Sequence, residues 1–175
     1  RHLSILSSVF RLAVELALLE VNPCRGIKKA KENKSRDRFL QHDEYMRFVR
    51  VLAGMLDRPQ ARAIFLLLAT GMRKSELLGL AWEDISLPDR QAYLKDPKNR
   101  ESRYLALNSV AVDLLSTMHK ERKSPWVFPS RSSTSKTPHL KEVKRTFNLV
   151  CDKAQVKGLR LHDLRRSHAA HLLAS

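Results

Sequence analysis

The sequence lacks the features that mark several large classes of protein. It has two cysteines, Cys24 and Cys151, in 175 residues, which is too few for a disulfide scaffold and too isolated for a zinc site. We expect Cys24 in a linker and Cys151 in the core of a protein from a reducing compartment. No apolar run is long enough to cross a membrane, and no targeting peptide is visible. We also find no cluster of acidic residues like those that hold Mg²⁺ in metal-dependent nucleases.

Negative charge is scarce as well. The chain has 33 Lys and Arg residues against 18 Asp and Glu, which gives a net charge of +15. A chain this basic has nucleic acid as its leading partner. Its cations are spread among apolar periodic segments rather than gathered in a tail. Since 43% of the residues are hydrophobic, the chain can build one compact domain with a core and some appended structure.

Periodicity predicts a mainly helical chain with one small sheet. A helix is expected over 3–21 and ends at Asn22-Pro23, because the residue before a proline avoids the helical region. The run over 25–38 is polar, basic and aperiodic, which is typical of a linker. Further helices are expected over 43–56 (beginning at Gln41 or Asp43), 59–69, 75–80, 109–121 and 139–155, and strands over 91–94 and 102–107. The predicted fold class is α+β, mainly α, with helices around a small antiparallel sheet of about three strands.

A first cationic motif directly follows the most apolar predicted helix. It reads Thr70-Gly71-Met72-Arg73-Lys74-Ser75-Glu76-Leu77. Gly71 allows a tight turn, and Arg73 then lies at the start of the next helix. Glu76, three residues further on, can pair with Arg73 or cap the turn. Taken alone, the motif is more simply explained as an ordinary surface ion pair.

A second cationic motif, His162-Asp163-Leu164-Arg165, opens the last predicted helix. His162 and Arg165 are three residues apart and share a helix face, and Asp163 is placed to act as a cap or first-turn acid. A helix N-terminus with two added cationic side chains suits a phosphate. The side of this helix expected to be buried consists of Leu161, Leu164, Ala169, Leu172 and Leu173.

In combination these motifs resemble the catalytic domain of the tyrosine recombinase, or phage integrase, family. The family's Thr-Gly-x-Arg-x-x-Glu-Leu box matches 70–77, and its His-x-Leu-Arg box matches 162–165. Its β-hairpin lysine matches Lys98 in Asp96-Pro97-Lys98-Asn99, with Lys95 as the competing position. Pro97 stands where the family often has Thr. The resemblance covers nearly the whole chain.

The resemblance implies a domain organisation. Residues 1–22 would be the C-terminal helix of a core-binding domain, 23–38 a basic interdomain linker, and 39–175 a catalytic domain that is incomplete at its C-terminus. The family's nucleophile is a Tyr beyond the His-x-Leu-Arg helix, so it is expected outside this chain. Tyr45, Tyr93 and Tyr104 are instead expected in core or strand positions. His168 and His171 are expected to pack rather than react.

The resemblance also implies a chemistry, which is site-specific DNA recombination through a phosphotyrosyl intermediate, without a metal or other cofactor. Arg73 and Arg165 would hold the phosphoryl oxygens, and His162 would bond the phosphate or accept the nucleophile's proton. Lys98 would protonate the leaving 5′-oxygen. Two acids, Glu76 and Asp163, would be structural supports. Contacts to the DNA backbone are expected from Arg25, Lys28, Lys29, Lys31, Lys34, Arg36, Arg38, Lys74 and Arg166.

The expected partner is therefore duplex DNA that carries attachment-type sites of a mobile element. By resemblance, the full-length protein would act as a tetramer in the cytoplasm of a bacterial or phage-infected cell. The present chain alone is expected to be a monomer that binds DNA without cleaving it. Two alternatives stay open, namely a non-catalytic DNA-binding module on the same scaffold and an enzyme of the type IB topoisomerase kind. A metal-dependent nuclease is a weaker one.

Overall fold

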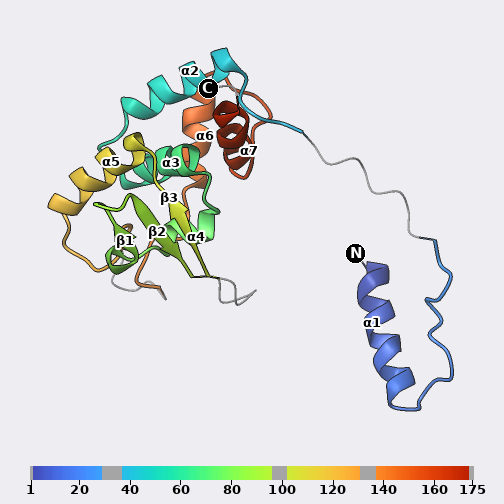
Figure 1. Ribbon diagram of the computed structural model, residues 1–175. Helices are drawn as coiled ribbons and strands as arrows, with labels where there is room; N and C mark the ends of the chain where they lie inside the picture. The colour runs from blue at the N-terminus through green and yellow to red at the C-terminus, as the bar shows by residue number, and fades with distance from the viewer. Residues whose placement is uncertain (1, 29–36, 96–101, 131–136, 174–175) are drawn as a thin grey trace. The chain divides into compact units, whose positions relative to one another are not determined.

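The computed structural model describes residues 2–28, 37–95, 102–130 and 137–173, and it divides into two compact units. Unit 1 comprises Arg1–Asp37 and unit 2 comprises Arg38–Ser175. The described residues form seven α-helices, one short 3-10 helix and three strands (Figure 1). Within these ranges, no helix has both the length and the apolar character needed to span a bilayer.

Unit 1 contains one helix, α1 (His2–Glu15), which is shorter than predicted. The apolar period continues to Val21, but Ala17 adopts a left-handed backbone with φ 56° and ends the helical path. The chain then turns back, and the Asn22 side chain donates a hydrogen bond of 2.9 Å to the carbonyl oxygen of Ser7. The predicted helical segment 16–21 is therefore a turn.

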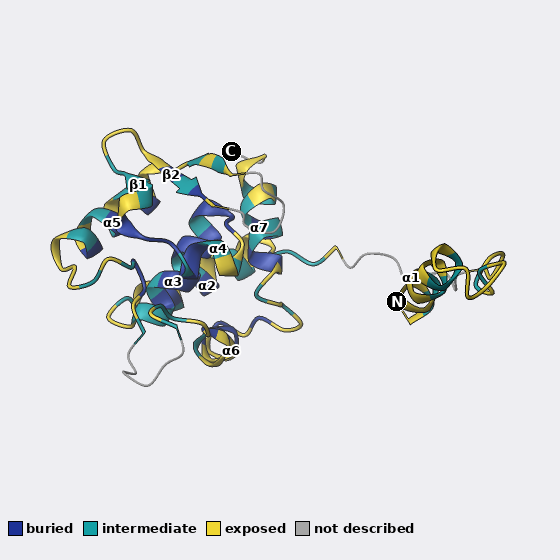
Figure 2. Cartoon of the chain, turned by 90° about the horizontal axis from the view of Figure 1, so that it is seen from below, coloured by how far each residue is buried: buried dark blue, intermediate teal, exposed yellow. Residues whose placement is uncertain are grey.

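Unit 2 is organised around α3 (Pro59–Thr70), whose first residue, Pro59, needs no N–H partner at that position. Five other helices pack against it: α2 (His42–Ala53), α4 (Lys74–Leu78), α5 (Ser109–Lys120), α6 (Lys144–Lys153) and α7 (Asp163–Leu172). Figure 2 shows α3 among the most buried parts of this unit. The residues that α3 buries are Ala61, Ala63, Ile64, Leu66, Leu67, Leu68 and Thr70.

A small sheet lies beside this helical layer (Figure 1). The 3-10 helix η1 (Trp82–Asp84) leads into β1 (Ile85–Ser86), which is followed by β2 (Gln91–Leu94) and β3 (Arg103–Ala106). The strands are antiparallel in the order β1-β2-β3, and the β2–β3 register pairs Leu94 with Arg103. The architecture confirms the predicted fold class and strand number.

Side chains that satisfy backbone N–H groups fix the starts of two helices. The helix expected over 109–121 is capped by Asn108, whose side chain accepts a 2.9 Å hydrogen bond from the Ala111 N–H. The helix expected from His139 begins at Lys144. Glu142 accepts hydrogen bonds from the N–H groups of Val143 and Lys144, both at 2.9 Å, and so fixes the later start.

The buried face of α7 was also predicted incorrectly in part. Leu164 is 1% exposed as expected, but Leu172 and Leu173 are 60% and 91% exposed. The polar residues Asp163 and Ser167 are buried instead, because each has hydrogen-bond partners inside the unit. The buried side of α7 is therefore defined by polar contacts as well as by Leu164.

Candidate functional site

Gly71 creates the turn that positions the first cationic motif. It caps α3 with φ 64° and ψ 16°, a left-handed conformation that strongly favours glycine. Thr70 braces the same turn, since its hydroxyl donates to the Leu66 carbonyl at 2.6 Å and accepts from the Met72 N–H at 3.3 Å. Arg73 follows as the N-cap residue of the short helix α4 (Lys74–Leu78). The predicted turn and helix start are confirmed here.

Glu76 joins Arg73 to a second arginine that the sequence did not single out. Its Oε2 accepts the Arg73 backbone N–H at 2.8 Å. Its Oε1 accepts both Nη1 of Arg73 at 2.7 Å and Nη2 of Arg103 at 2.9 Å. Burial alone would raise the pKa of this carboxyl, but the Arg73 N–H and the two guanidinium groups outweigh it and hold the pKa below its ordinary value. Glu76 is thus ionised and held by three hydrogen bonds.

The second motif is built at the start of α7. His162 is the N-cap residue, and Asp163 is buried, with Oδ2 accepting the Arg160 N–H at 2.8 Å. Asp163 therefore supports the turn that leads into the helix. Arg165 points toward the first motif, and its Nη1 donates a 2.9 Å hydrogen bond to the Gly71 carbonyl oxygen. This bond brings the two motifs side by side although they are far apart in the sequence.

His168 packs against the same turn. Its Nδ1 lies 3.1 Å from the Leu68 carbonyl oxygen, and a Cβ added at Gly71 would lie 2.6 Å from its Cδ2. Burial lowers the pKa of His168, and the positive charge of Arg165 acts in the same direction. His171 contacts the Tyr45 ring with centroids 4.1 Å apart and lies 3.1 Å from the Leu40 carbonyl oxygen. Both histidines pack, as predicted.

A hollow of about 460 Å³ adjoins the two motifs. Leu67, Met72 and Phe147 contribute to its apolar wall, Arg165 is among its cationic residues, and His162 also lines it. Its lining is completed by Lys74, Glu142, Lys144, Asn148, Leu159, Arg160, Leu161 and Leu164. The combination of an apolar wall and clustered cations suits an anionic ligand that also has an apolar part.

The two hairpin lysines fall in different places. Lys98 lies outside the described residues, so its predicted role is untested. Lys95 directly follows β2, and its Nζ pairs with Asp84 at 2.7 Å and Glu83 at 3.3 Å. These interactions raise the pKa of Lys95, and the hydrogen bond to Asp84 is the largest cause.

The predicted DNA-binding cations are distributed over both units. Arg25 and Lys28 are exposed in unit 1, whereas Lys29, Lys31, Lys34 and Arg36 lie outside the described residues. In unit 2, Lys74 lies 3.6 Å from Glu142, and Arg166 is partly buried on α7.

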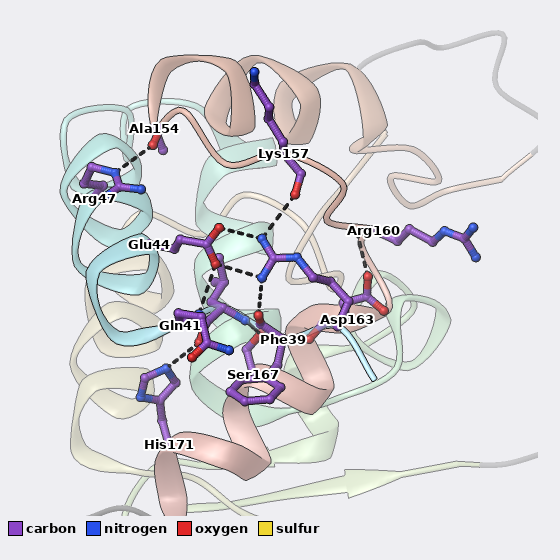
Figure 3. A network of polar contacts seen from close by, with 12 residues as sticks. Phe39, Gln41, Glu44, Arg47, Ala154, Lys157, Arg160, Asp163, Ser167 and His171 are labelled. Carbon is purple, nitrogen blue, oxygen red and sulfur yellow. Dashed lines mark hydrogen bonds and ion pairs between the residues drawn. The ribbon is translucent and has the colours of Figure 1, made fainter. Parts of the chain in front are cut away.

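Arg38 has a structural position in unit 2, where it binds Glu44 and Lys157, two of the residues labelled in Figure 3. Its guanidinium binds both carboxylate oxygens of Glu44, at 2.7 and 2.6 Å. It also donates to the carbonyl oxygens of Phe39 and Lys157. The pKa of Glu44 is lowered, with the hydrogen bond from Arg38 as the largest cause. Arg38 thereby fastens the start of unit 2 to the turn that precedes α7.

Among the described residues, no group of three or more His, Cys, Asp and Glu side chains is placed to hold a metal ion. The candidate site instead joins Arg73, paired with the partly buried Glu76, to Arg165, which lines the hollow together with His162 and Lys74. Such a set can bind and polarise a phosphodiester.

Comparisons with solved structures agree with this architecture. An integrase of the Tn1549 transposon, in complex with transposon right end DNA, matches with a TM-score of 0.77 and 17% identity, over 96% of this chain and 64% of that one. A lambda integrase tetramer bound to a Holliday junction matches with a TM-score of 0.68 and 20% identity, over 96% of this chain and 52% of that one. At these identities the likeness establishes the fold alone.

Sequence comparisons identify the family. The shufflon-specific DNA recombinase of Escherichia coli is 32% identical over 94% of this chain and 40% of its own length. The ICEBs1 integrase of Bacillus subtilis strain 168 is 24% identical over 96% of this chain and 52% of its own length. The chain thus spans about half the length of these relatives. The model of the phage integrase family matches residues 38–175, which is the whole of unit 2. The chain belongs to the phage integrase family, the family of the tyrosine recombinases.

Proposed function

We propose that this chain is part of a site-specific DNA recombinase that cuts and rejoins strands by transesterification at a tyrosine. The observation that carries the proposal is the hydrogen bond from Arg165 to the Gly71 carbonyl oxygen. This bond supports the proposal because it joins the two cationic motifs. Met72 and Lys74 of the first motif and His162 and Arg165 of the second line one hollow, and Arg73 precedes Lys74 in the chain. Relatives whose names include integrase and recombinase support the same reaction class.

Each residue of the proposed site has a distinct task. Arg73 and Arg165 bind phosphoryl oxygens and stabilise the negative charge that develops in the transition state. His162 bonds the phosphate or accepts the proton of the nucleophile. Lys98 protonates the leaving 5′-oxygen. Lys95 is the less suitable general acid because its ammonium group already forms ion pairs with Glu83 and Asp84. Glu76 and Asp163 hold the two motifs in place.

The wider assignments follow from this proposal. Duplex DNA with attachment-type sites is the substrate, residues 1–22 belong to a core-binding domain, and 23–38 are a basic linker. A tetramer on two duplexes, working in the cytoplasm of a bacterial or phage-infected cell, is the proposed functional state. In this proposal the present chain alone is a monomer that binds DNA. It does not cleave DNA, because the Tyr nucleophile lies outside it. In this proposal the reaction needs no external energy source, since the phosphotyrosyl bond conserves the energy of the phosphodiester. It also needs no metal, because Arg73 and Arg165 supply the charge stabilisation.

The test compares this chain with a longer one that continues past Ser175 to include the expected Tyr. Each is incubated with a nicked suicide duplex that traps a covalent protein–DNA adduct. We expect an adduct from the longer chain alone, and its loss on Arg73→Ala or Arg165→Ala. Cleavage by the present chain would contradict the proposal. Salt-sensitive binding without an adduct from either chain would favour a non-catalytic DNA-binding module, and relaxation of supercoils without strand exchange would favour a topoisomerase.

The general acid is tested with a duplex whose scissile phosphate has a bridging 5′-sulfur. A thiolate leaves without protonation, so it bypasses a missing general acid. In the longer chain, Lys98→Met should slow cleavage of the normal duplex and act almost like wild type on the sulfur-containing one. Lys95→Met is the matched control and should cleave both at wild-type rates. Rescue of Lys95→Met instead would assign the role to Lys95.

A further inference from the structure

Arg103 shares one carboxylate oxygen with Arg73. Both guanidinium groups donate to Oε1 of Glu76, at 2.7 Å from Arg73 and 2.9 Å from Arg103. The Glu76 side chain is 8% exposed, whereas those of Arg73 and Arg103 are 47% and 36% exposed. The buried carboxylate therefore links two more accessible cations, one from the start of α4 and one from the start of β3.

The charges of Arg73, Glu76 and Arg103 affect how strongly Arg73 can bind an anion. Glu76 and Arg73 alone would form a closed pair with no net charge, and the partly buried carboxylate would attract the guanidinium strongly because water screens it poorly. Arg103 on the same oxygen divides that attraction between two partners. It also leaves the trio with an excess of one positive charge.

We propose that Arg103 is a positioning residue that acts on Arg73 through Glu76. Arg103 fixes the carboxylate from the sheet side and offsets its charge, so that the guanidinium of Arg73 stays oriented and available for a phosphoryl oxygen. The effect on catalysis rests on the proposed function. The sharing of the carboxylate rests only on the contacts of Glu76 with Arg73 and Arg103. Without Arg103, Glu76 would pair with Arg73 alone. The guanidinium of Arg73 would then be held more strongly by the carboxylate and would bind the scissile phosphate less tightly.

A carboxyl titration tests the shared carboxylate without any recombination assay. In the present chain, the pKa of the Glu76 carboxyl is followed by ¹³C NMR in wild type, Arg103→Gln and Arg50→Gln. Arg103→Gln should raise this pKa, because the carboxylate loses a hydrogen bond and a neighbouring positive charge. Arg50→Gln removes the same charge from an exposed position on α2 and should leave the pKa unchanged. An unchanged pKa in Arg103→Gln would overturn the inference.

A double-mutant cycle then tests the route of the effect. The readout is the rate of adduct formation on the suicide duplex by the longer chain that includes the Tyr. Arg103→Gln should lower this rate about tenfold in the wild-type background and less than about threefold in the Glu76→Gln background, which is the non-additivity expected of residues that act through one another. Arg103→Lys, which keeps the charge, should recover most of the rate. Equal circular dichroism melting temperatures show that folding is not the cause.

The outcomes separate this inference from the function on which it rests. An equal loss from Arg103→Gln in both backgrounds would mean that Arg103 contacts DNA directly and would overturn its action through Glu76. Absence of an adduct in the wild-type longer chain would remove the proposed function. The carboxyl titration would still decide whether Arg103 and Arg73 share Glu76.

Discussion

Replacement of Gly71 by alanine probes the junction between the two motifs most directly. The added methyl group has two costs. A non-glycine residue at φ 64° costs about 1–2 kcal/mol in backbone energy. The new Cβ would also lie 2.6 Å from Cδ2 of His168, and such overpacking costs about 1–3 kcal/mol. We therefore expect Gly71→Ala to lower the free energy of unfolding of unit 2 by about 2–5 kcal/mol.

Urea denaturation of the present chain, followed by circular dichroism, measures this change. Gly54→Ala is the matched control, because Gly54 ends α2 with φ −72° and a Cβ there would meet no atom closer than 3.7 Å. It should leave stability unchanged or raise it by up to about 1 kcal/mol.

The double variant Gly71→Ala, His168→Ala separates the steric cost from the backbone cost. It should be destabilised by less than the sum of the two single variants, since removal of the ring removes the clash. Unfolding of Gly71→Ala within about 0.5 kcal/mol of wild type would refute the reasoning. So would strict additivity in the double variant. Either result would mean that the turn accommodates a side chain and that His168 does not close it.

Three further predictions concern the supports of the site. Ser167→Ala leaves the buried Leu40 N–H without its acceptor, which lies at 2.8 Å in wild type. The free energy of unfolding from urea denaturation should fall by about 1–3 kcal/mol, against less than about 0.5 kcal/mol when an exposed serine is replaced. Cys151 is buried, which raises the pKa of its thiol to about 11, so in Cys24→Ser it should react with a thiol reagent at pH 8 only after unfolding; prompt reaction would contradict its burial. The pKa of Glu76 is lowered in the folded state, so its ionised form stabilises the fold fully above the ordinary value of 4.5. This contribution is lost as pH falls through the lower folded value. Glu76→Gln should therefore flatten that part of the curve of stability against pH, and an unchanged curve would contradict the role of Glu76.

The sequence predicted those parts of the site that are encoded locally. Gly71 and Arg73 stand in one short motif, and His162 and Arg165 in another, so spacing along the chain sufficed to place them at helix starts. The predicted strand 91–94 and the turn after α3 were also confirmed, because alternation and a lone glycine after an apolar run are local signals.

Arg103 was missed because its partner is distant in the sequence. Arg103 shares the more buried face of β3 with Leu105, whereas Tyr104 and Ala106 are exposed. An arginine on that face needs a partner, and alternation does not say which one. What distinguishes Arg103 is its contact with Glu76, which arises when β3 packs beside α4. The signal that the sequence offered was an arginine on the apolar face of a predicted strand. That signal marks Arg103 as a residue with a partner but does not identify Glu76.

Helix ends were missed for a different reason. Apolar periodicity continues past Glu15 to Val21, but Ala17 breaks the helix through its backbone conformation. In the opposite direction, the periodic segment before α6 is not helical, because Glu142 provides a cap inside it. Periodicity reports which residues can share a face, whereas the cap decides where the helix begins.

The helix that bears Arg165 is positioned mainly by bonds from side chains to backbone atoms. Arg165 donates to the Gly71 carbonyl oxygen, Ser167 accepts the Leu40 N–H, and His171 lies 3.1 Å from the Leu40 carbonyl oxygen. Bonds of this kind depend on the path of the neighbouring chain and not on which side chains that chain carries. The geometry of the site can therefore be kept while the surrounding residues change, provided that Gly71 keeps its left-handed turn. This makes Gly71 the position where a small substitution should disturb both cationic motifs at once.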